Sequence, residues 1–509
     1  MTVVLPTAPA LEGRSLVSFD GASNRGAARL AADVVVVGSG PAGAAVARTA
    51  ARGGASVLVV EEGPFVEPSA FPPDSFSAFA SMYRDMGASV LLGRAPMPFV
   101  QGRVVGGTSV VNGAISWRLP EDVHARWIEA DPALDETLSW DAIVRATDEV
   151  ERDLHIAPTD PAIAGPKNLL MAKGADALGL EHRPIFRNVH DCRGLGRCLQ
   201  GCPIGRKMSM DRTYLPDAVL HGARIACSTR IDRVLVAHGR AIGVVGRTAG
   251  GGRFEANARH AVVLAASAVQ SPRLLLASGI AGGPVGEGFQ CHPGVSVTGR
   301  FGEPIRAWEG ATQGHEVIGL RKEGLKFEAL GFGSAMVAAR IKGVGSDLSR
   351  GLETMAHSLS WGAAVRAEAR GRVGRWTVRF DLTRDDVSRF RRGVRVLGEL
   401  MLAAGAIEVT PGIARWHERV TDRATMSRLE DEAPLDPRAY AAVVTHMFGT
   451  CRMGSHPERS VVRPDFRHHG LEGLYVADSS VFPSNTGVNP QTAILALATL
   501  AGRRILSGS

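Results

Sequence analysis

The clearest chemical signal in the sequence is a glycine-rich turn suited to binding a dinucleotide. Gly38, Gly40 and Gly43 have the spacing G-x-G-x-x-G, and Glu61 follows them roughly 20 residues on, as such a fingerprint requires. The glycines allow backbone N–H groups to approach a pyrophosphate at the start of a helix. A carboxylate at Glu61 accepts hydrogen bonds from a ribose hydroxyl and disfavours a 2′-phosphate. The alternative is a glycine turn of an unrelated α/β protein.

A second chemical signal is a cluster of three cysteines, Cys192, Cys198 and Cys202, in a glycine-rich segment. In a chain without an evident export signal, clustered cysteines indicate metal or redox chemistry before disulfides. Three thiolates suit a three-iron cluster better than a cluster that demands four cysteines. The alternatives are a zinc site with His190 as a further ligand, and cysteines with only a structural role.

The elements around the first motif predict a parallel sheet. Val34–Val37 is an uninterrupted β-branched run, typical of a strand buried on both faces. A helix is expected over 44–52 and a second strand over 55–60, which completes a βαβ unit around the glycine turn. Further strands are expected over 261–265 and 474–482, and a final helix over 490–505.

The middle of the chain predicts a different architecture. Residues 294–440 contain alternating segments that are typical of an antiparallel sheet with covering helices. We therefore expect a loose leader over 1–30, a discontinuous Rossmann-like α/β domain, and an inserted α+β substrate domain. The discontinuous domain is predicted to comprise 31–293, with the cysteine loop at 188–212, and 441–509.

Composition excludes several classes of protein. The chain has 509 residues, of which 45% are hydrophobic and 21% charged, so it can bury a large core and is not disordered. The net charge of +7 is mild and dispersed, which argues against a nucleic-acid partner. Without an apolar run long enough for a membrane span, and without a signal peptide, we expect a cytoplasmic protein.

Three longer segments carry a family resemblance. GRVVGGTSVVNGA at 102–114, ASAVQSPRLLLASG at 266–279, and the C-terminal HMFGTCRMG with VFPSNTGVNPQ are long, specific motifs. Together they resemble the glucose–methanol–choline (GMC) family of FAD oxidoreductases. The resemblance covers the cofactor segments but not residues 294–440.

The resemblance implies how FAD is held. Gly38, Gly40, Gly43 and Glu61 would bind its ADP part. The segment that would line the isoalloxazine and pyrophosphate comprises Gly106, Gly107, Thr108, Ser109 and Asn112, while Asp478 would approach the ribityl or pyrophosphate region. Some members tether FAD through a His just before this Asn, where this chain has Val111, so non-covalent FAD is expected.

The resemblance also implies a catalytic pair. His446 matches the active-site His of the family, and Asn489 matches a partner position. An imidazole suits removal of a hydroxyl proton, and a neutral amide can stabilise the developing alkoxide while hydride passes to flavin N5. Asn489 is also expected to cap a helix whose first residue is Pro490, with the positive end of the dipole toward the flavin. The alternative makes Asn489 only a cap and His446 a core residue.

Three other histidines receive structural interpretations. His292 is interpreted as part of a structural turn, and His468 and His469 as exposed surface residues.

The cysteine loop is similar to that of sugar and gluconate dehydrogenase flavoprotein subunits, where it holds a [3Fe–4S] cluster. The expected activity is therefore FAD-dependent oxidation of an alcohol group of a polyol, sugar or sugar-containing natural product. The electron acceptor would be O2, a quinone or a redox protein. The alternatives are an O2-using biosynthetic oxidase of an aminoglycoside or other secondary metabolite, and a non-catalytic electron-transfer flavoprotein.

Overall fold

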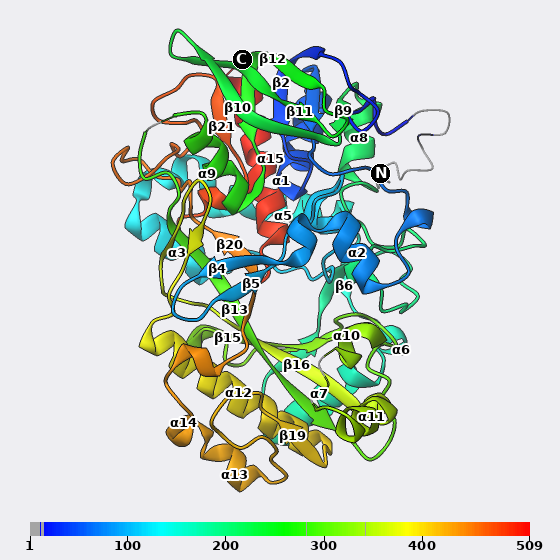
Figure 1. Cartoon of the computed structure of the whole chain (residues 1–509). Helices are drawn as coiled ribbons and strands as arrows, with labels where there is room; N and C mark the ends of the chain where they lie inside the picture. Colours follow the sequence, from blue (N-terminus) through cyan, green and yellow to red (C-terminus); the bar gives the residue numbers. More distant parts are fainter. Residues whose placement is uncertain (1–10, 12–14, 281, 340, 342, 509) are drawn as a thin grey trace.

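Two β-sheets, one above the other, organise the molecule (Figure 1). The structure is a computed structural model and describes residues 11, 15–280, 282–339, 341 and 343–508. The first sheet takes its strands largely from the N-terminal half and, with β21, from near the C-terminus, and the second is built largely from the middle of the sequence. Segments between the two sheets carry the functional residues discussed below.

The first sheet has eight strands within the described ranges, in the order β1-β9-β3-β2-β12-β11-β10, with β21 also paired to β12. Its strands are β1 (Phe19–Asp20), β2 (Ala28–Val37), β3 (Val57–Val60), β9 (Arg224–Cys227), β10 (Thr229–Ala237), β11 (Arg240–Thr248), β12 (Arg253–Leu264) and β21 (Leu474–Val476). The pairs formed by β1, β9, β3, β2, β12 and β21 are parallel, and β10 and β11 add an antiparallel edge.

The valine run that predicted a buried strand lies at the centre of this sheet. Val35 pairs with Leu58 on one side and with Val262 on the other, and all three side chains are fully buried. Helix α1 (Pro41–Arg52) connects β2 to β3 and begins immediately after Gly40. The predicted βαβ unit is thus confirmed.

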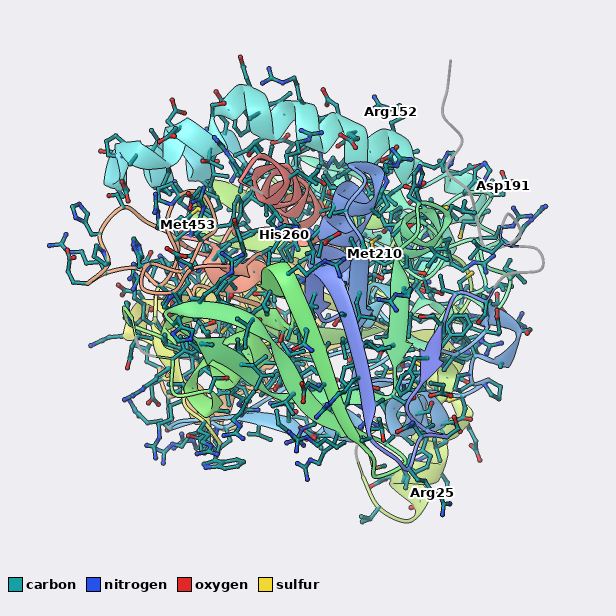
Figure 2. The ribbon with its side chains drawn as sticks, turned by 90° about the horizontal axis from the view of Figure 1, so that it is seen from above. Arg25, Arg152, Asp191, Met210, His260 and Met453 are labelled. Atoms are coloured by element: carbon teal, nitrogen blue, oxygen red, sulfur yellow. The ribbon has the colours of Figure 1, made fainter. Side chains whose placement is uncertain are left out.

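Helices cover one face of the first sheet. Figure 2 shows α5 (Trp140–Asp153), which carries Arg152, as the outer layer. The C-terminal helix α15 (Gln491–Ser507) packs against both α1 and α5. The other helices that flank this half are α2 (Ser75–Met82), α3 (Glu121–Ala130), α4 (Asp135–Leu138), α8 (Tyr214–Leu220) and α9 (Ser267–Ala277).

The second sheet is mostly antiparallel and has eleven strands in the described part of the chain. Its order is β17-β18-β4-β5-β20-β13-β16-β15-β14-β7, with β19 paired to β13. These strands are β4 (Ser89–Leu92), β5 (Met97–Phe99), β7 (His182–Pro184), β13 (Glu287–Arg300), β14 (His315–Val317), β15 (Leu325–Leu330), β16 (Ser358–Val365), β17 (Gly371–Val373), β18 (Val378–Arg379), β19 (Glu408–Thr410) and β20 (Val443–Phe448). A separate pair joins β6 (Ile156–Pro158) to β8 (Phe186–Asn188).

Two long helices pack on the second sheet and on each other, α7 (Pro166–Leu178) and α12 (Arg384–Ala404). A capping box between Thr383 and Asp386 starts α12, and Gly405 ends it in the left-handed conformation. Shorter helices complete this half: α6 (Pro161–Ala164), α10 (Ser334–Ala338), α11 (Ser346–Glu353), α13 (Arg423–Ser427) and α14 (Leu429–Glu432).

The fold departs from the predicted boundaries in three places. The leader predicted over 1–30 is not loose at its end, because β1 pairs with β9 and β2 begins at Ala28; residues 1–10 and 12–14 lie outside the described residues. The second sheet takes β4, β5, β7 and β20 from outside 294–440, since sheet neighbours need not be neighbours in sequence. The strand predicted over 474–482 ends at Val476, where Asp478 starts a tight turn.

None of the helices in the described ranges has the length and apolarity needed to cross a lipid bilayer.

Candidate active site

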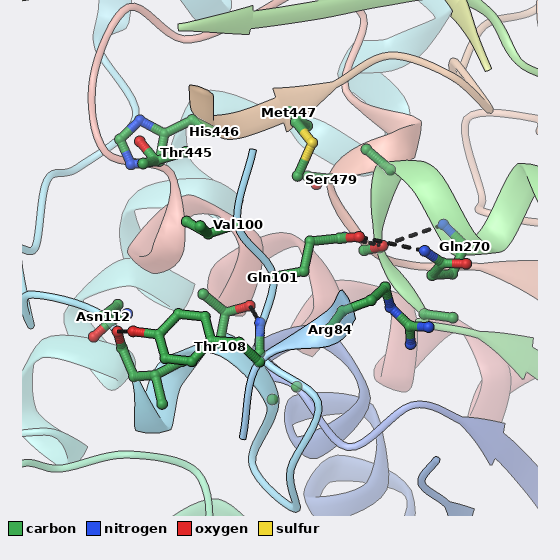
Figure 3. Close-up of a pocket in the computed structure, with 18 of the residues that line it drawn as sticks. Arg84, Val100, Gln101, Thr108, Asn112, Gln270, Thr445, His446, Met447 and Ser479 are labelled. Atoms are coloured by element: carbon green, nitrogen blue, oxygen red, sulfur yellow. Dashed lines mark hydrogen bonds between the residues drawn. The ribbon is translucent and has the colours of Figure 1, made fainter. Parts of the chain in front are cut away.

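A cavity of about 1670 Å³ extends between the two sheets. It is lined at one end by the glycine turn after β2 and at the other by strands of the second sheet. Figure 3 shows Thr445, His446 and Met447 on one wall, above Thr108 and Asn112. The dinucleotide-binding turn and the predicted catalytic residues therefore line the same cavity.

The glycine turn forms a cradle that leaves no room for side chains. Gly38 has a φ of +101°, and a Cβ on Gly43 would lie 1.9 Å from the Gly38 carbonyl oxygen. Gly40 occupies the N-cap position of α1 without a side-chain cap, so the first turn of the helix faces the cavity with its backbone N–H groups. This geometry fits a pyrophosphate.

Glu61 lies at the end of β3 and lines the cavity. One carboxylate oxygen accepts hydrogen bonds from N–H and O–H of Ser39, and the other accepts from the Gly63 N–H at 2.8 Å. Burial raises the pKa of Glu61 although these bonds oppose the shift. The carboxylate thus braces the glycine turn, and Oε1, which accepts only the bond from Gly63, retains a lone pair for a ribose hydroxyl.

The second glycine segment approaches the first very closely. Gly107 has a φ of +57°, and a Cβ there would lie 2.6 Å from Cα of Gly40. Asn112 links this segment to the C-terminal helix, because its Nδ2 donates to Oε1 of Gln491 at 2.5 Å. Nε2 of Gln491 lines the cavity, is buried, and has no partner among the described residues. An unpaired buried donor at this point supports a polar ligand here.

Two predicted cofactor residues also bond to the protein itself. Ser109 donates to the Gly106 carbonyl and accepts from the Met210 N–H. Asp478 accepts from the Ser267 N–H and the Ser271 hydroxyl with one oxygen, and from the Ser480 N–H with the other. Together with Thr108, which accepts from the Gly102 N–H, they shape the cavity wall.

The predicted catalytic residues lie next to each other in the wall of the cavity. His446 lies on β20 with part of its ring exposed to the cavity, and Asn489 precedes α15. Nδ2 of Asn489 lies 3.5 Å from Nε2 of His446. Burial and the positive charge of Lys326 lower the pKa of His446 to about 3, so its imidazole is neutral near pH 7.

His292, interpreted from sequence as structural, contacts the candidate base directly. Its Nδ1 lies 3.2 Å from Nδ1 of His446, and its Nε2 lies 3.0 Å from the Gly487 N–H. Burial and the neighbouring His446 lower the pKa of His292 far below its usual value, while a hydrogen bond with Asn485 partly counters the shift. The two rings therefore form a neutral pair.

Two other sequence predictions about this region are wrong. Helix α15 begins at Gln491, and Pro490 occupies the cap position, where its carbonyl accepts from the Ile494 N–H. The Asn489 side chain is therefore free of capping and points to His446 and Lys326. His468 is buried rather than exposed, and burial lowers its pKa to about 4.

The cysteine loop does not form a metal site in this structure. Among the described residues, no group of three or more His, Cys, Asp or Glu side chains is arranged to hold a metal ion. The sulfur atoms of Cys192 and Cys198 instead accept from the Arg187 guanidinium, and that of Cys202 accepts from the Arg206 N–H. The geometry gives the [3Fe–4S] hypothesis no support.

Lys326 is the functional residue that sequence reasoning missed most clearly. It lies on β15 with its ammonium 2.7 Å from Oδ1 of Asn489. In LKFEAL the apolar residues alternate with Lys326 and Glu328. That alternation was the available signal, because it places both charged residues on the face opposite the core.

Comparisons with known proteins agree with this geometry. Models described as GMC oxidoreductase match residues 79–294 and 367–498, and an FAD-binding-domain model matches 33–71. An uncharacterized GMC-type oxidoreductase of Mycobacterium tuberculosis is 36% identical over 92% of this chain and 74% of its own length. The long-chain-alcohol oxidase FAO1 of Arabidopsis thaliana is 26% identical over 94% and 67%. The structure of pyridoxine 4-oxidase from Mesorbium loti has a similar fold, with a TM-score of 0.70, 19% identity, and coverage of 92% and 98%.

Proposed function

The chain belongs to the GMC oxidoreductase family, and we propose that it oxidises the CH–OH group of an alcohol to a carbonyl, with His446 and Asn489 as the reacting pair. The observation that carries this proposal is their position: they face each other in the same cavity as the dinucleotide turn. FAD, when bound non-covalently there, supplies the hydride acceptor.

The residues proposed to hold the ADP part of FAD are Gly38, Gly40, Gly43 and Glu61. Backbone N–H groups of the first turn of α1 would bind the pyrophosphate. Those proposed to lie along the rest of the cofactor are Gly106, Gly107, Thr108, Ser109, Asn112, Asp478 and Pro490. The free Nε2 of Gln491 adds a donor that the sequence did not suggest.

The proton of the alcohol is assigned to Nε2 of His446. This nitrogen is free to accept when the ring proton of His446 lies on Nδ1, and the Asn489 N–H group 3.5 Å away points toward it. The Asn489 N–H group donates to the substrate oxygen as negative charge develops on it.

The substrate proposed is an alcohol with a largely apolar body. Apolar side chains form a large part of the cavity wall, among them Ile115, Leu199, Val295, Leu330, Phe332, Met336, Ala363 and Val443. The carboxylate of Glu328, which also lines the cavity, is already bonded to Lys326 and Gln313. A polyol or sugar would leave many hydroxyl groups unpaired against this wall, so it is the less favoured of the two substrate classes.

The electron acceptor is proposed to be O2. The name of the Arabidopsis relative, a long-chain-alcohol oxidase, supports this choice. Oxygen consumption compared with the reduction of an artificial dye separates an oxidase from a dehydrogenase that uses a quinone or a redox protein.

Anaerobic flavin bleaching tests the proposal. We expect 1-dodecanol to bleach the flavin at least about ten times faster than sorbitol or glucose, which corresponds to roughly 1.4 kcal/mol in barrier height. His446→Ala should slow bleaching at least about 10²-fold. His468→Gln, which removes another buried histidine outside the cavity, is the matched control and should not. Equal loss in both variants, or no bleaching by any alcohol, would contradict the proposal.

A further inference from the structure

Lys326 is buried in the wall of the cavity with all of its hydrogen-bonding capacity used. Its side chain is 1% exposed. The ammonium group contacts three acceptors: Oε2 of Glu316 at 2.9 Å, Oε1 of Glu328, and Oδ1 of Asn489 at 2.7 Å. A lysine ammonium has three N–H donors and no acceptor, so each donor has one partner.

This arrangement determines which way the Asn489 amide points. A side-chain amide has an oxygen end and an NH2 end that are otherwise hard to distinguish. Because Lys326 has only donors, the amide atom at 2.7 Å from it must be the oxygen. The NH2 end is therefore directed to Nε2 of His446, on the side of the cavity.

The charges around Lys326 keep it protonated and fixed. Two carboxylates, on Glu316 and Glu328, outweigh the effect of burial and raise the pKa of Lys326. Glu316 in turn accepts from Nε of Arg183 and from Nε1 of Trp117, each at 2.8 Å. Lys326, Glu316, Glu328 and Arg183 thus form one ion cluster. Within it, Lys326 is the residue that contacts Asn489.

We propose that Lys326 is a positioning residue that holds the Asn489 amide with its N–H groups toward the reacting oxygen and His446. The proposal rests on the proposed alcohol oxidation. Without this ammonium, the amide can turn its oxygen toward the cavity, where it would repel a developing alkoxide instead of stabilising it.

Lys326 also acts on His446 through its charge. The groups that face the His446 ring are His292 from β13, Lys326 from β15 and the neutral Asn489. Arg366, after β16, acts on His292. Of these, Lys326 lowers the pKa of His446 by its positive charge, so its removal should shift protonation of His446 to higher pH.

Two variants separate orientation from charge. Lys326→Gln keeps a donor for Asn489 but loses the charge. Lys326→Met combined with Glu328→Gln loses both, and the second substitution avoids leaving the Glu328 carboxylate unpaired in the buried wall. Glu328→Gln alone is the control.

The readout is flavin reduction by 1-octanol across pH. We expect the double variant to lose at least about 10²-fold in the rate of flavin reduction, the usual effect of losing one oxyanion donor. The rate of flavin reduction should fall clearly less in Lys326→Gln. In both Lys326 variants the acid limb of the pH–rate profile should move to higher pH. In an Asn489→Ala background the Lys326 substitutions should have no further effect on the rate; an undiminished effect there would overturn the proposal.

A second readout does not need turnover. The NMR titration of the His446 imidazole should move to higher pH in Lys326→Gln, and an unmoved titration would also overturn the inference. If the wild-type enzyme is not reduced by any alcohol, the proposed function fails by itself. The Lys326–Asn489 contact is then tested by the NH2 resonances of Asn489, which should lose their single fixed environment in the double variant.

Discussion

Replacing Lys207 with Met should release FAD from the protein. Lys207 is buried between the second glycine segment and the cysteine loop, and burial lowers its pKa to about 8. Its ammonium donates to three backbone carbonyls: that of Val110 at 2.5 Å, that of Asn112 at 3.0 Å and that of Cys198 at 2.8 Å. It is therefore a clamp that holds Val111 and Asn112 at the cavity wall.

The free energy lost in Lys207→Met can be estimated from these three hydrogen bonds. A buried carbonyl that loses its partner costs about 1–3 kcal/mol, so the total loss is about 3–5 kcal/mol once the loop relaxes. Met has a similar volume and leaves only a small void, so the loss of hydrogen bonds dominates. If about 3 kcal/mol of this is needed to close the loop on FAD, the affinity should fall roughly 10²-fold.

The measurement is FAD affinity by fluorescence, together with thermal unfolding. Lys167→Met is the matched control: Lys167 is equally buried, its pKa is also lowered to about 8, and within the described residues its ammonium bonds to one carbonyl, that of Glu309. The control should lose stability but keep FAD. Wild-type affinity in Lys207→Met, or an equal loss of affinity in the two variants, would refute the reasoning.

Three further predictions concern the cradle, the base and the cysteine loop. Gly43→Ala should abolish FAD retention without loss of secondary structure, because its Cβ would lie 1.9 Å from the Gly38 oxygen; Gly26→Ala, whose Cβ meets nothing within 4 Å, should retain FAD in the same absorbance assay. Because the pKa of His446 is lowered to about 3, its neutral form is the main one at pH 5 and above, and kcat/KM should stay flat between pH 5 and 8. An unperturbed histidine, with a pKa of about 6.5, would instead be about 97% protonated at pH 5, so an acid limb near pH 6.5 would contradict the pKa argument. Replacing Cys192, Cys198 and Cys202 together with Ser should leave the visible spectrum and the iron content unchanged, since their sulfur atoms form no metal-ligand group; about three iron atoms per chain in the wild type, lost in the variant, would restore the cluster hypothesis.

The backbone part of the site could be predicted from sequence because it depends on local rules. A glycine is required wherever a Cβ would collide, and Gly38, Gly43 and Gly107 each meet that condition. The valine run of β2 and the helix predicted over 44–52, which is α1, likewise follow from patterns that need no knowledge of distant residues.

Of the side chains, His446 and Asn489 could be proposed from the family resemblance, but the contacts of His292 and Lys326 could not be predicted because they join distant segments. His292 and His446 are 154 residues apart in sequence, and Lys326 and Asn489 are 163 apart. No local rule places such residues together, and a histidine or lysine within an apolar strand is more simply interpreted as structural. The alternation in β15 indicates only that Lys326 and Glu328 share a face, not that Asn489 lies opposite.

The two effects of Lys326 have opposite consequences for the rate, and pH separates them. Its positive charge weakens His446 as a proton acceptor, whereas its hydrogen bond to Asn489 supports the N–H group that stabilises negative charge on the substrate oxygen. Well above pH 6.5, His446 is neutral in every variant, so any loss of rate there reports the orientation of the amide alone. As the pH decreases, loss of the charge adds a second loss, because it raises the pKa of His446; burial, the larger cause of the lowered pKa, remains, so this loss appears at the acid end of the pH range. Lys326→Gln should therefore lie close to the wild type at pH 8 and fall progressively behind it as the pH decreases, a divergence that a purely structural lysine would not produce.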